Sequence, residues 1–284
     1  MPAANDQHYE WFNLIEIAGP FLAIPVLQQV FPQGLDGLVT NDRQRLRQAY
    51  EEWVEVVENK ESDLLGIHRE WILMVMKDAL EYGEELKVDT SELHEPLEMK
   101  AIGRENKPAI IVTAYAPGTN LLKPVPGSLS VESPEETMRA RCKTEEVRIG
   151  IVTNGEEWML VNAPVGKTSG YAMWHARIWW QEPVTLKAFS SLLNIRRAFG
   201  PPEETMDQLL ERSTEFHEEV TDTLGEQVRH AVEVLVRALG RADQDRNGEL
   251  LKDVDPKQLY EAGLTVMMRL VFTLCAEERE LLLL

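Results

Sequence analysis

The sequence has few cysteines and few basic residues. Cys142 and Cys275 are its two cysteines in 284 residues, and neither has a neighbour at metal-ligand spacing. This gives no disulfide framework and is typical of a reducing compartment. Lysine and arginine number 29 against 48 aspartates and glutamates, so the formal net charge is -19. Because phosphate binding draws on Lys and Arg, this balance argues against a general nucleic-acid coat but leaves room for a local basic patch.

The sequence also lacks recognisable targeting and membrane-spanning signals. The segment MPAANDQHYEWF has no basic stretch followed by an apolar core, so no secretory signal peptide is predicted. The longest apolar run, residues 264–274, is short for a bilayer and contains Arg269. We therefore expect a cytoplasmic protein without a membrane partner. The final leucines of AEERELLLL predict a chain that continues in a longer protein or docks on another surface.

The spacing of apolar residues and the positions of Pro, Gly and Asn-Gly predict a mixed fold with two domains. Short apolar segments bounded by Pro, Gly and the Asn154-Gly155 turn indicate strand pairs, and three- and four-residue apolar spacing indicates helices. The predicted fold class is α+β or α/β, with a small mixed sheet in domain 1–182 and a helical connector in 183–284. The expected elements are helices in 8–87, a strand pair in 96–118, a helix opened by Ser133-Pro134, a strand pair in 147–163, an edge strand in 171–180, and helices from 183 onward.

The strand pair PLEMKAIGRENKPAIIVTAYAPG, residues 96–118, contains the most suggestive motif. Metal-dependent nucleases place acidic residues and a Glu-x-Lys on the strands of one hairpin. Strand alternation puts Glu98 and Lys100 on the same face. Two carboxylates on adjacent strands would hold Mg²⁺, and a lysine would orient the attacking water. The more buried strand, however, is predicted to be AIIVTAY rather than the strand with Glu98.

A partial calcium-loop pattern lies near the carboxyl end. Asp243, Asp245 and Asn247 fill positions 1, 3 and 5 of an EF-hand loop, with a glycine at position 6. Position 12, which supplies a bidentate glutamate in such loops, is Val254. The predicted structure is an interhelical loop, with calcium binding as the weaker alternative and no metal as the first expectation.

Basic and aromatic residues supply the candidates for nucleic-acid contact. The best phosphate-binding candidates are Arg196, Arg197, Arg43 and Arg47. The simpler interpretation is that these arginines lie on a solvated helix surface. Aromatic rings can stack on unpaired bases, but strand tryptophans more often pack in a core. The tryptophans in question are Trp158, Trp174, Trp179 and Trp180.

Four segments in order resemble a known family of proteins. They are HYEWFNLIEIAGPFLAIPVLQQVFPQGLD, VRIGIVTNGEEWMLV, TDTLGEQVRHAVEVLVRAL and LYEAGLTVMMRLVFTLCAEERELLL. Together they resemble the N-terminal region of bacterial restriction–modification and phage-defence DNA methyltransferases of the type IIG-like and DISARM-like kinds. The resemblance implies a PD-(D/E)XK nuclease-like domain followed by a helical connector that leads toward a methyltransferase domain.

The usual register of that nuclease family implies a degenerate site. It places Leu97 where the family has its aspartate, and Thr113 and Tyr115 where the family has glutamate and lysine. An alternative register keeps an active Mg²⁺-dependent endonuclease. Its catalytic residues would be Glu98 and Lys100, completed by Glu16 or Asp89, with Glu98 and Asp89 as metal ligands.

The resemblance also sets expectations for cofactors and partners. The chain has no Asn/Asp-Pro-Pro-Tyr/Phe motif and no glycine-rich S-adenosylmethionine loop, so methyl transfer is not expected from it. S-adenosylmethionine would belong to another domain, and Mg²⁺ only to an active nuclease. The expected partners are DNA, a methyltransferase domain or other defence subunits. A purely structural docking scaffold is the third hypothesis.

Overall fold

The computed structural model describes residues 4–59, 63–88, 96–103, 107–128, 130–278 and 281. The chain forms two compact units, residues 1–214 and 215–284. The predicted boundary at 182/183 lies inside the first of these units, because the chain directly after residue 183 packs there. Helix α6 (Pro183–Leu193), for example, contributes Phe189 to the core of that unit, where its ring centroid lies 4.8 Å from that of Trp179.

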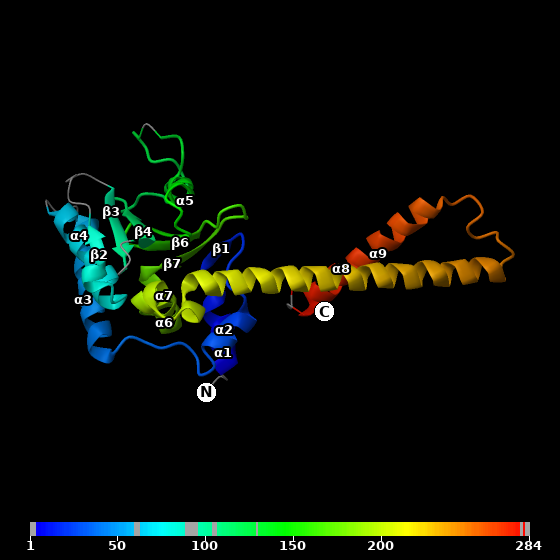
Figure 1. The fold of residues 1–284 in the computed structure, drawn as a ribbon, viewed down its shortest axis with the longest axis horizontal. Coiled ribbons are helices and arrows are strands. Elements are labelled where there is room, and N and C mark those ends of the chain that lie inside the picture. The colour runs from blue at the N-terminus through cyan, green and yellow to red at the C-terminus, as the bar shows by residue number, and fades with distance from the viewer. Residues whose placement is uncertain are drawn as a thin grey trace. The chain divides into compact units, whose positions relative to one another are not determined.

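The first unit is built on one seven-stranded sheet with the order β1-β7-β6-β5-β4-β3-β2 (Figure 1). Its neighbouring strands are antiparallel except β4 and β5, which are parallel. The fold is therefore a mixed α+β arrangement, as the sequence predicts at that level. The strands are β1 Glu16–Ala18, β2 Leu86–Val88, β3 Leu97–Ile102, β4 Pro108–Ala114, β5 Ile149–Thr153, β6 Glu157–Asn162 and β7 Gly170–His175.

Helices precede, interrupt and follow these strands. Helix α4 continues into a π-helical turn, Val75–Ala79, and the parallel strands β4 and β5 are joined through α5. The helices are α1 Ala4–Phe12, α2 Ile24–Val30, α3 Thr40–Asn59, α4 Leu64–Met74, α5 Pro134–Thr144, α6 Pro183–Leu193, α7 Ile195–Phe199, α8 Met206–Asp245 and α9 Pro256–Glu278.

The predicted hairpins and helix start are present. Strands β3 and β4 pair antiparallel, and β4 is buried from Ile110 onward. Helix α5 begins with the predicted capping box, because the Ser133 hydroxyl accepts the Glu136 amide while the Glu136 carboxylate accepts the Ser133 amide. The Asn154-Gly155 turn joins β5 to β6, and Gly155 has a φ of 90°. Local turn and capping chemistry thus fixes the ends of these elements.

Two short strands were not expected in the N-terminal segment. Residues 8–87 read as helical, yet β1 pairs with β7 and β2 pairs with β3. As a result β7, predicted as an edge strand, lies between β6 and β1. Both additions are three residues long, which is too short for a period-two pattern to stand out.

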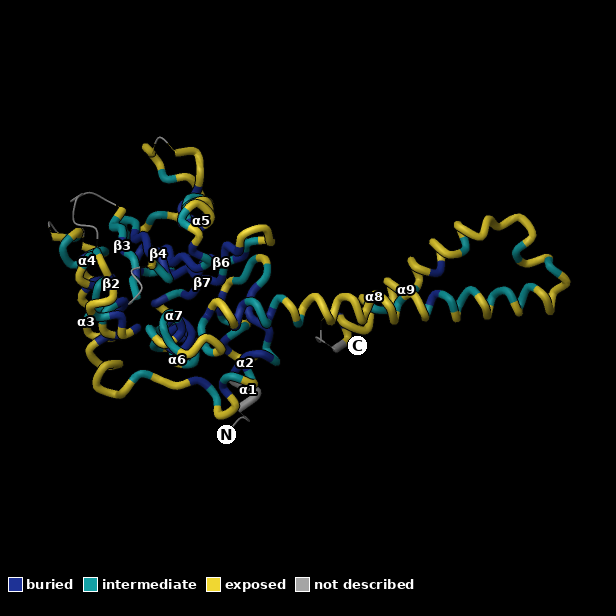
Figure 2. The backbone as a smooth tube through the Cα atoms, in the orientation of Figure 1, coloured by how far each residue is buried: buried dark blue, intermediate teal, exposed yellow. Residues whose placement is uncertain are grey.

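The two faces of the sheet bury different cores. On one face α5 packs its Met138 and Cys142 against Ile111, Val152 and Met159. On the other face Phe189 of α6 packs among Trp158, Trp174 and Trp179. In Figure 2 the dark, buried part of the chain is concentrated in these strands and the helices beside them. Three of the four tryptophans are therefore core: Trp158, Trp174 and Trp179 are at most 1% exposed, whereas Trp180 is only partly buried.

The second unit contains most of α8 and all of α9. Pro256–Glu277 of α9 is long and apolar enough to cross a membrane by length and composition alone, and few residues in its apolar 18-residue window are buried. The helix extends beyond the run 264–274 at both ends. Localisation remains a prediction.

Candidate functional site

The hairpin of β3 and β4 presents its polar residues to α5. Glu98 lies opposite Thr113, and Lys100 lies opposite Ile111. Ile111 belongs to the core beneath α5, and strand alternation puts Thr113 on the same face. The predicted shared face of Glu98 and Lys100 is thus correct, and that face looks toward the helix that follows the hairpin.

An ion-pair cluster on α5 occupies both residues of the Glu-x-Lys motif. Arg141 Nη2 lies 2.9 Å from Glu98 Oε2, and Arg141 Nε donates to Glu145 Oε1 at 2.8 Å. Lys100 Nζ donates to the other carboxylate oxygen, Glu145 Oε2, at 2.6 Å. The cluster therefore contains two cations and two anions in one closed set.

The electrostatics of this cluster favour its charged form. Partial burial by itself raises the pKa of the Glu145 carboxyl, but hydrogen bonds from Lys100 and Arg141 outweigh burial and hold that pKa below its ordinary value. The side chains of Arg141 and Glu145 are 20% and 25% exposed. With each carboxylate already neutralised by a cation, the cluster has no surplus negative charge for Mg²⁺.

The positions that the nuclease resemblance implies for catalysis, residues 97, 113 and 115, carry no carboxylate. Thr113, in the glutamate position, is buried, and its hydroxyl accepts from Arg141 Nη1 at 3.4 Å. Leu97 pairs with Ala114 across the hairpin. Tyr115 continues the pairing with β5, where its amide donates to the Thr153 carbonyl at 2.8 Å. A hydroxyl and a phenol on this face, with the Leu97 alkyl group on the opposite face, do not provide the paired carboxylates that a Mg²⁺ site needs.

Glu16 does not complete a site with Glu98. It lies on β1, at the opposite end of the strand order from β3. Five strand spacings separate the two strands, or roughly 24 Å at about 4.8 Å per spacing. Glu16 Oε1 instead lies 3.2 Å from His175 Nε2 on β7. Asp89, the other proposed partner, lies outside the described residues.

The four candidate DNA-binding arginines have different surroundings. Arg197 is 9% exposed, donates to the carbonyls of Ser191 and Glu204, and stacks 4.7 Å over the Phe31 ring. It is therefore a structural residue and not a phosphate contact. Arg43 and Arg47 are exposed on α3, and Arg47 is paired with Glu51 at 2.8 Å.

Arg196 lines a groove of about 950 Å³ at the end of β2, β3 and β4. Its side chain is 65% exposed and lies 3.2 Å from Glu204. Lys87 and Lys107 line the same groove, together with the acids Glu84 and Glu85. Sequence reasoning found only Arg196, since Lys87 comes from β2 and Lys107 from the residue before β4.

The partial calcium pattern covers the end of α8 and the start of the predicted loop between α8 and α9. Asp243 and Asp245 lie in the last turn of α8, which continues through Asp245. Asp243 Oδ1 accepts the Leu251 amide at 2.9 Å, and the Gly248 amide donates to the Asp243 carbonyl at 2.8 Å. Asn247 has a φ of 57° in the turn after the helix. The pattern is therefore a helix C-cap.

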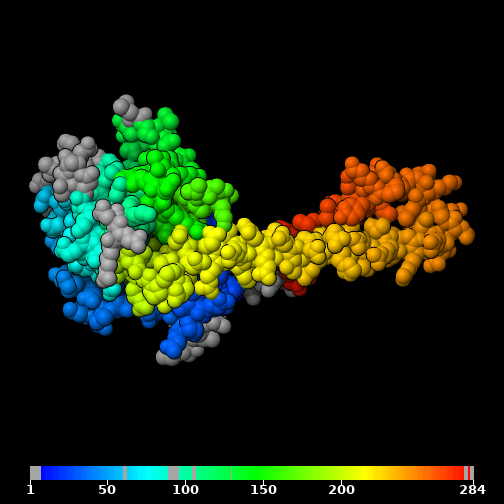
Figure 3. All heavy atoms as spheres, viewed as in Figure 1, coloured from blue at the N-terminus to red at the C-terminus, as the bar shows by residue number. Residues whose placement is uncertain are grey.

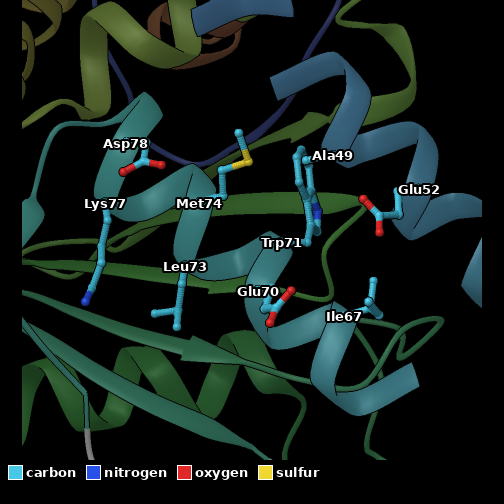
Figure 4. A pocket seen from close by; sticks show the side chains of 9 residues that line it. All are labelled: Ala49, Glu52, Ile67, Glu70, Trp71, Leu73, Met74, Lys77 and Asp78. Atoms are coloured by element: carbon cyan, nitrogen blue, oxygen red, sulfur yellow. The ribbon is translucent and has the colours of Figure 1, made fainter. Parts of the chain in front are cut away.

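A second groove, of about 420 Å³, lies between α3 and α4. Figure 4 shows Glu52 reaching toward it from α3, with Glu70 and Trp71 on α4 and Asp78 on the turn beyond. Trp71 forms its apolar floor and is 2% exposed. The acidic residues of this groove do not form a metal site. Among the residues that the structure describes, no group of at least three His, Cys, Asp or Glu side chains is placed to hold a metal ion.

Sequence reasoning missed the residues that decide the chemistry of the hairpin. Arg141 and Glu145 stand four residues apart on α5, a spacing that placed them on one helix face. What the sequence did not show was that this face meets β3. Scanned against protein-family models, curated proteins and solved structures, the chain matches none of them.

Proposed function

We propose that the first unit is a catalytically inactive, nuclease-like module of a DNA-modifying phage-defence protein, and that it engages DNA or a partner subunit. The observation that carries this proposal is the closed ion-pair cluster of Glu98, Lys100, Arg141 and Glu145. A carboxylate held 2.9 Å from an arginine is occupied by a cation that stays charged at any working pH. Mg²⁺ would have to displace that cation before it could bind.

The order of elements around the hairpin supports the nuclease-like part of the proposal. An antiparallel strand pair is followed by α5 and then by β5, which lies parallel to β4. The two carboxylates required on adjacent strands are represented by Glu98 alone, since its cross-strand neighbour is Thr113. The arrangement thus keeps a hairpin with a helix packed on it while lacking the second acid.

Plasmid cleavage with Mg²⁺ or Mn²⁺ tests the absence of catalysis. We expect the wild-type chain and Glu98→Ala to leave supercoiled plasmid intact to the same extent. Metal-dependent cutting by the wild type that disappears in Glu98→Ala would contradict the proposal and establish the active endonuclease instead.

Gel-shift at low and moderate salt separates DNA from a protein partner. The groove with Arg196, Lys87 and Lys107 is the basic surface tested. If DNA binds there, Arg196→Glu weakens retention and makes its loss with salt less steep, because fewer counterions are released on binding, whereas Arg43→Glu on α3 has little effect. If the chain does not shift DNA at any salt concentration, docking on a partner subunit remains as the proposed function.

A further inference from the structure

The groove between α3 and α4 lies apart from the β3–β4 hairpin and shares no lining residue with the groove of Arg196. Its volume of about 420 Å³ falls in the range of ligand-binding clefts. Figure 3 shows the chain of α3 and α4, blue to cyan, at the surface of the first unit. An open groove of this size can accept side chains from another molecule.

Apolar side chains line the middle of this groove. Ile67, Trp71 and Met74 are spaced by four and three residues, so they lie on one face of α4. Ala49 lines the groove from α3. Trp71 is 2% exposed, whereas Ile67 and Met74 are half-buried. The groove therefore has an apolar floor that the chain itself covers only in part.

The two helices run antiparallel along the groove. Arg45, early in α3, lies 3.9 Å from Asp78, which follows α4. Trp53, later in α3, donates its indole proton to His68 near the start of α4 at 3.0 Å. Glu52 on α3 therefore lies toward the end of the groove that is away from Asp78.

The charged residues of the groove are unevenly placed. At one end Asp78 is offset by Arg45 and by the neighbouring Lys77. Toward the other end Glu52 comes from α3 and Glu70 from α4, and both are exposed. Within the described ranges, neither of these two glutamates forms an ion pair. One carboxylate from each wall is thus available to a cation from another molecule.

Helix α4 departs from regular geometry beside the groove. The turn Val75–Ala79 is π-helical, and it contains Lys77 and Asp78 of the groove lining. Turns of this kind are rare and occur frequently at functional sites. The turn is a second feature, independent of charge, that marks this surface for binding.

We propose that the groove binds a short amphipathic helix of a partner protein, with lysine or arginine beside its apolar residues. The apolar side chains of that helix pack on Ile67, Trp71 and Met74. Its cationic side chains reach Glu52 and Glu70, which Figure 4 shows near the Trp71 ring. Lysine and arginine suit this place because their stems cover apolar surface while their heads pair with carboxylates. A helix laid in a groove presents residues three and four apart, the same spacing that lines α4.

The chemistry of the groove argues against other classes of occupant. The carboxylates of Glu52 and Glu70 repel the phosphates of nucleic acid and the headgroups of anionic lipids. A wholly apolar partner would remove water from both carboxylates without pairing them, which costs free energy. A lone metal ion would leave the apolar floor uncovered. A basic amphipathic helix satisfies the floor and the carboxylates together.

Binding at this groove is independent of the function proposed above. Any DNA contact of the first unit was assigned to the groove of Arg196, and the two grooves have different linings. Results from plasmid cleavage or gel-shift, of either kind, therefore leave the partner helix unaffected.

A fluorescently labelled synthetic helix tests the proposal with the full chain. The peptide spans roughly five helical turns, with leucine on one face and lysine on the other. Fluorescence anisotropy should show saturable binding to the wild type. Glu52→Gln combined with Glu70→Gln should raise the dissociation constant about tenfold or more, because two charge-assisted contacts are lost. Ala49→Phe, which keeps both carboxylates but fills the groove, should weaken binding by a similar factor.

The matched control is Glu218→Gln combined with Glu219→Gln, which removes the same charge from exposed positions on α8. It should bind like the wild type, and it is needed because a net charge of -19 attracts any basic peptide. A peptide with glutamate in place of lysine should not bind. Circular dichroism and urea midpoints should show that each variant folds.

Hydrogen exchange locates the peptide on the chain. Amides of residues 49–53 and 67–78 should exchange more slowly when the peptide is bound. Three results would overturn the proposal: no saturable binding, equal affinity of the wild type and the Glu52/Glu70 variant, or protection confined to other residues. A wild type that self-associates, and that Ala49→Phe makes monomeric, would assign the groove to a second copy and would equally contradict it.

Discussion

At the level of single residues, Arg141 determines what Glu98 is able to do. Its guanidinium contacts Glu98, Glu145 and the Thr113 hydroxyl from one position on α5. A planar donor of this kind binds carboxylates in fixed directions and does not lose its charge. The Glu-x-Lys motif is therefore explained by packing between β3 and α5, and no metal chemistry is needed to account for it.

Removing this guanidinium should destabilise the first unit. Arg141→Met keeps an unbranched apolar stem but leaves Glu98 and Glu145 without their shared cation. We expect the free energy of unfolding in urea to fall by about 1–2 kcal/mol, since the cluster is partly shielded from water. Arg47→Met, whose exposed pair with Glu51 has similar geometry, should cost about 0.5 kcal/mol or less. Equal losses in the two variants would contradict the role assigned to Arg141.

His68 should make stability depend on pH. Its Nδ1 accepts from the Trp53 indole at 3.0 Å, so Nε2 carries the proton shared with the Tyr115 carbonyl at 2.9 Å. Burial lowers the pKa of His68, even though the hydrogen bond to Tyr115 opposes that shift. The unfolded imidazole therefore takes up a proton at a higher pH than the folded one, and stability is lost as pH falls below about 6.5.

The His68→Gln variant measures that contribution. Urea midpoints between about pH 7 and about pH 5 should fall less steeply for the variant than for the wild type. Some slope should remain, because burial also lowers the pKa of His8. Identical slopes for the two proteins would show that His68 does not titrate as described.

At the level of elements, the turn between β5 and β6 joins three parts of the fold. The Gly155 carbonyl accepts the indole protons of Trp71 at 2.8 Å and Trp158 at 3.1 Å. Its φ of 90° favours glycine, and a Cβ there would lie 2.7 Å from the Trp53 ring. The turn therefore sets the approach of α3 and α4 to the sheet as well as the register of the hairpin.

Gly155→Ala should separate packing from backbone strain. We expect a loss of about 2–3 kcal/mol in unfolding free energy, since the variant combines a positive φ with a steric clash. Gly118→Ala is the matched control, because Gly118 has a φ of 78° and nothing lies within 4 Å of the added Cβ. Its loss should be about 1 kcal/mol. Equal losses would mean that the contact with Trp53 relaxes freely.

The same elements show how far sequence predicts this structure. Ser133-Pro134 and Asn154-Gly155 carry local chemistry, so the start of α5 and the β5–β6 turn were predictable. Strands β1 and β2 were missed because pairing with distant strands, and not local pattern, defines them. Likewise the spacing of Arg141 and Glu145 was visible, but their contact with β3 depends on how α5 crosses the sheet. Arg197 looked like a surface cation and is buried by tertiary packing.

At the level of the whole molecule, the chain combines a compact sheet unit with a helical unit that has little core of its own. The first unit fully buries the strand tryptophans Trp158 and Trp174, whereas the second leaves most large apolar side chains of α9 exposed. Acidic residues dominate the chain, with a formal net charge of -19. These properties suit a module that is held in place by a partner, with any DNA contact confined to a local basic groove.

Metal binding is the most direct test of the proposed inactive site. Calorimetric titration of the full chain with Mn²⁺ would be compared with the same titration of Glu98→Gln, which keeps the size of the side chain. We predict that the two proteins give the same weak, non-saturating signal, because Arg141 already occupies the Glu98 carboxylate. A saturable site in the wild type, with one ion per chain, that Glu98→Gln abolishes would contradict this account.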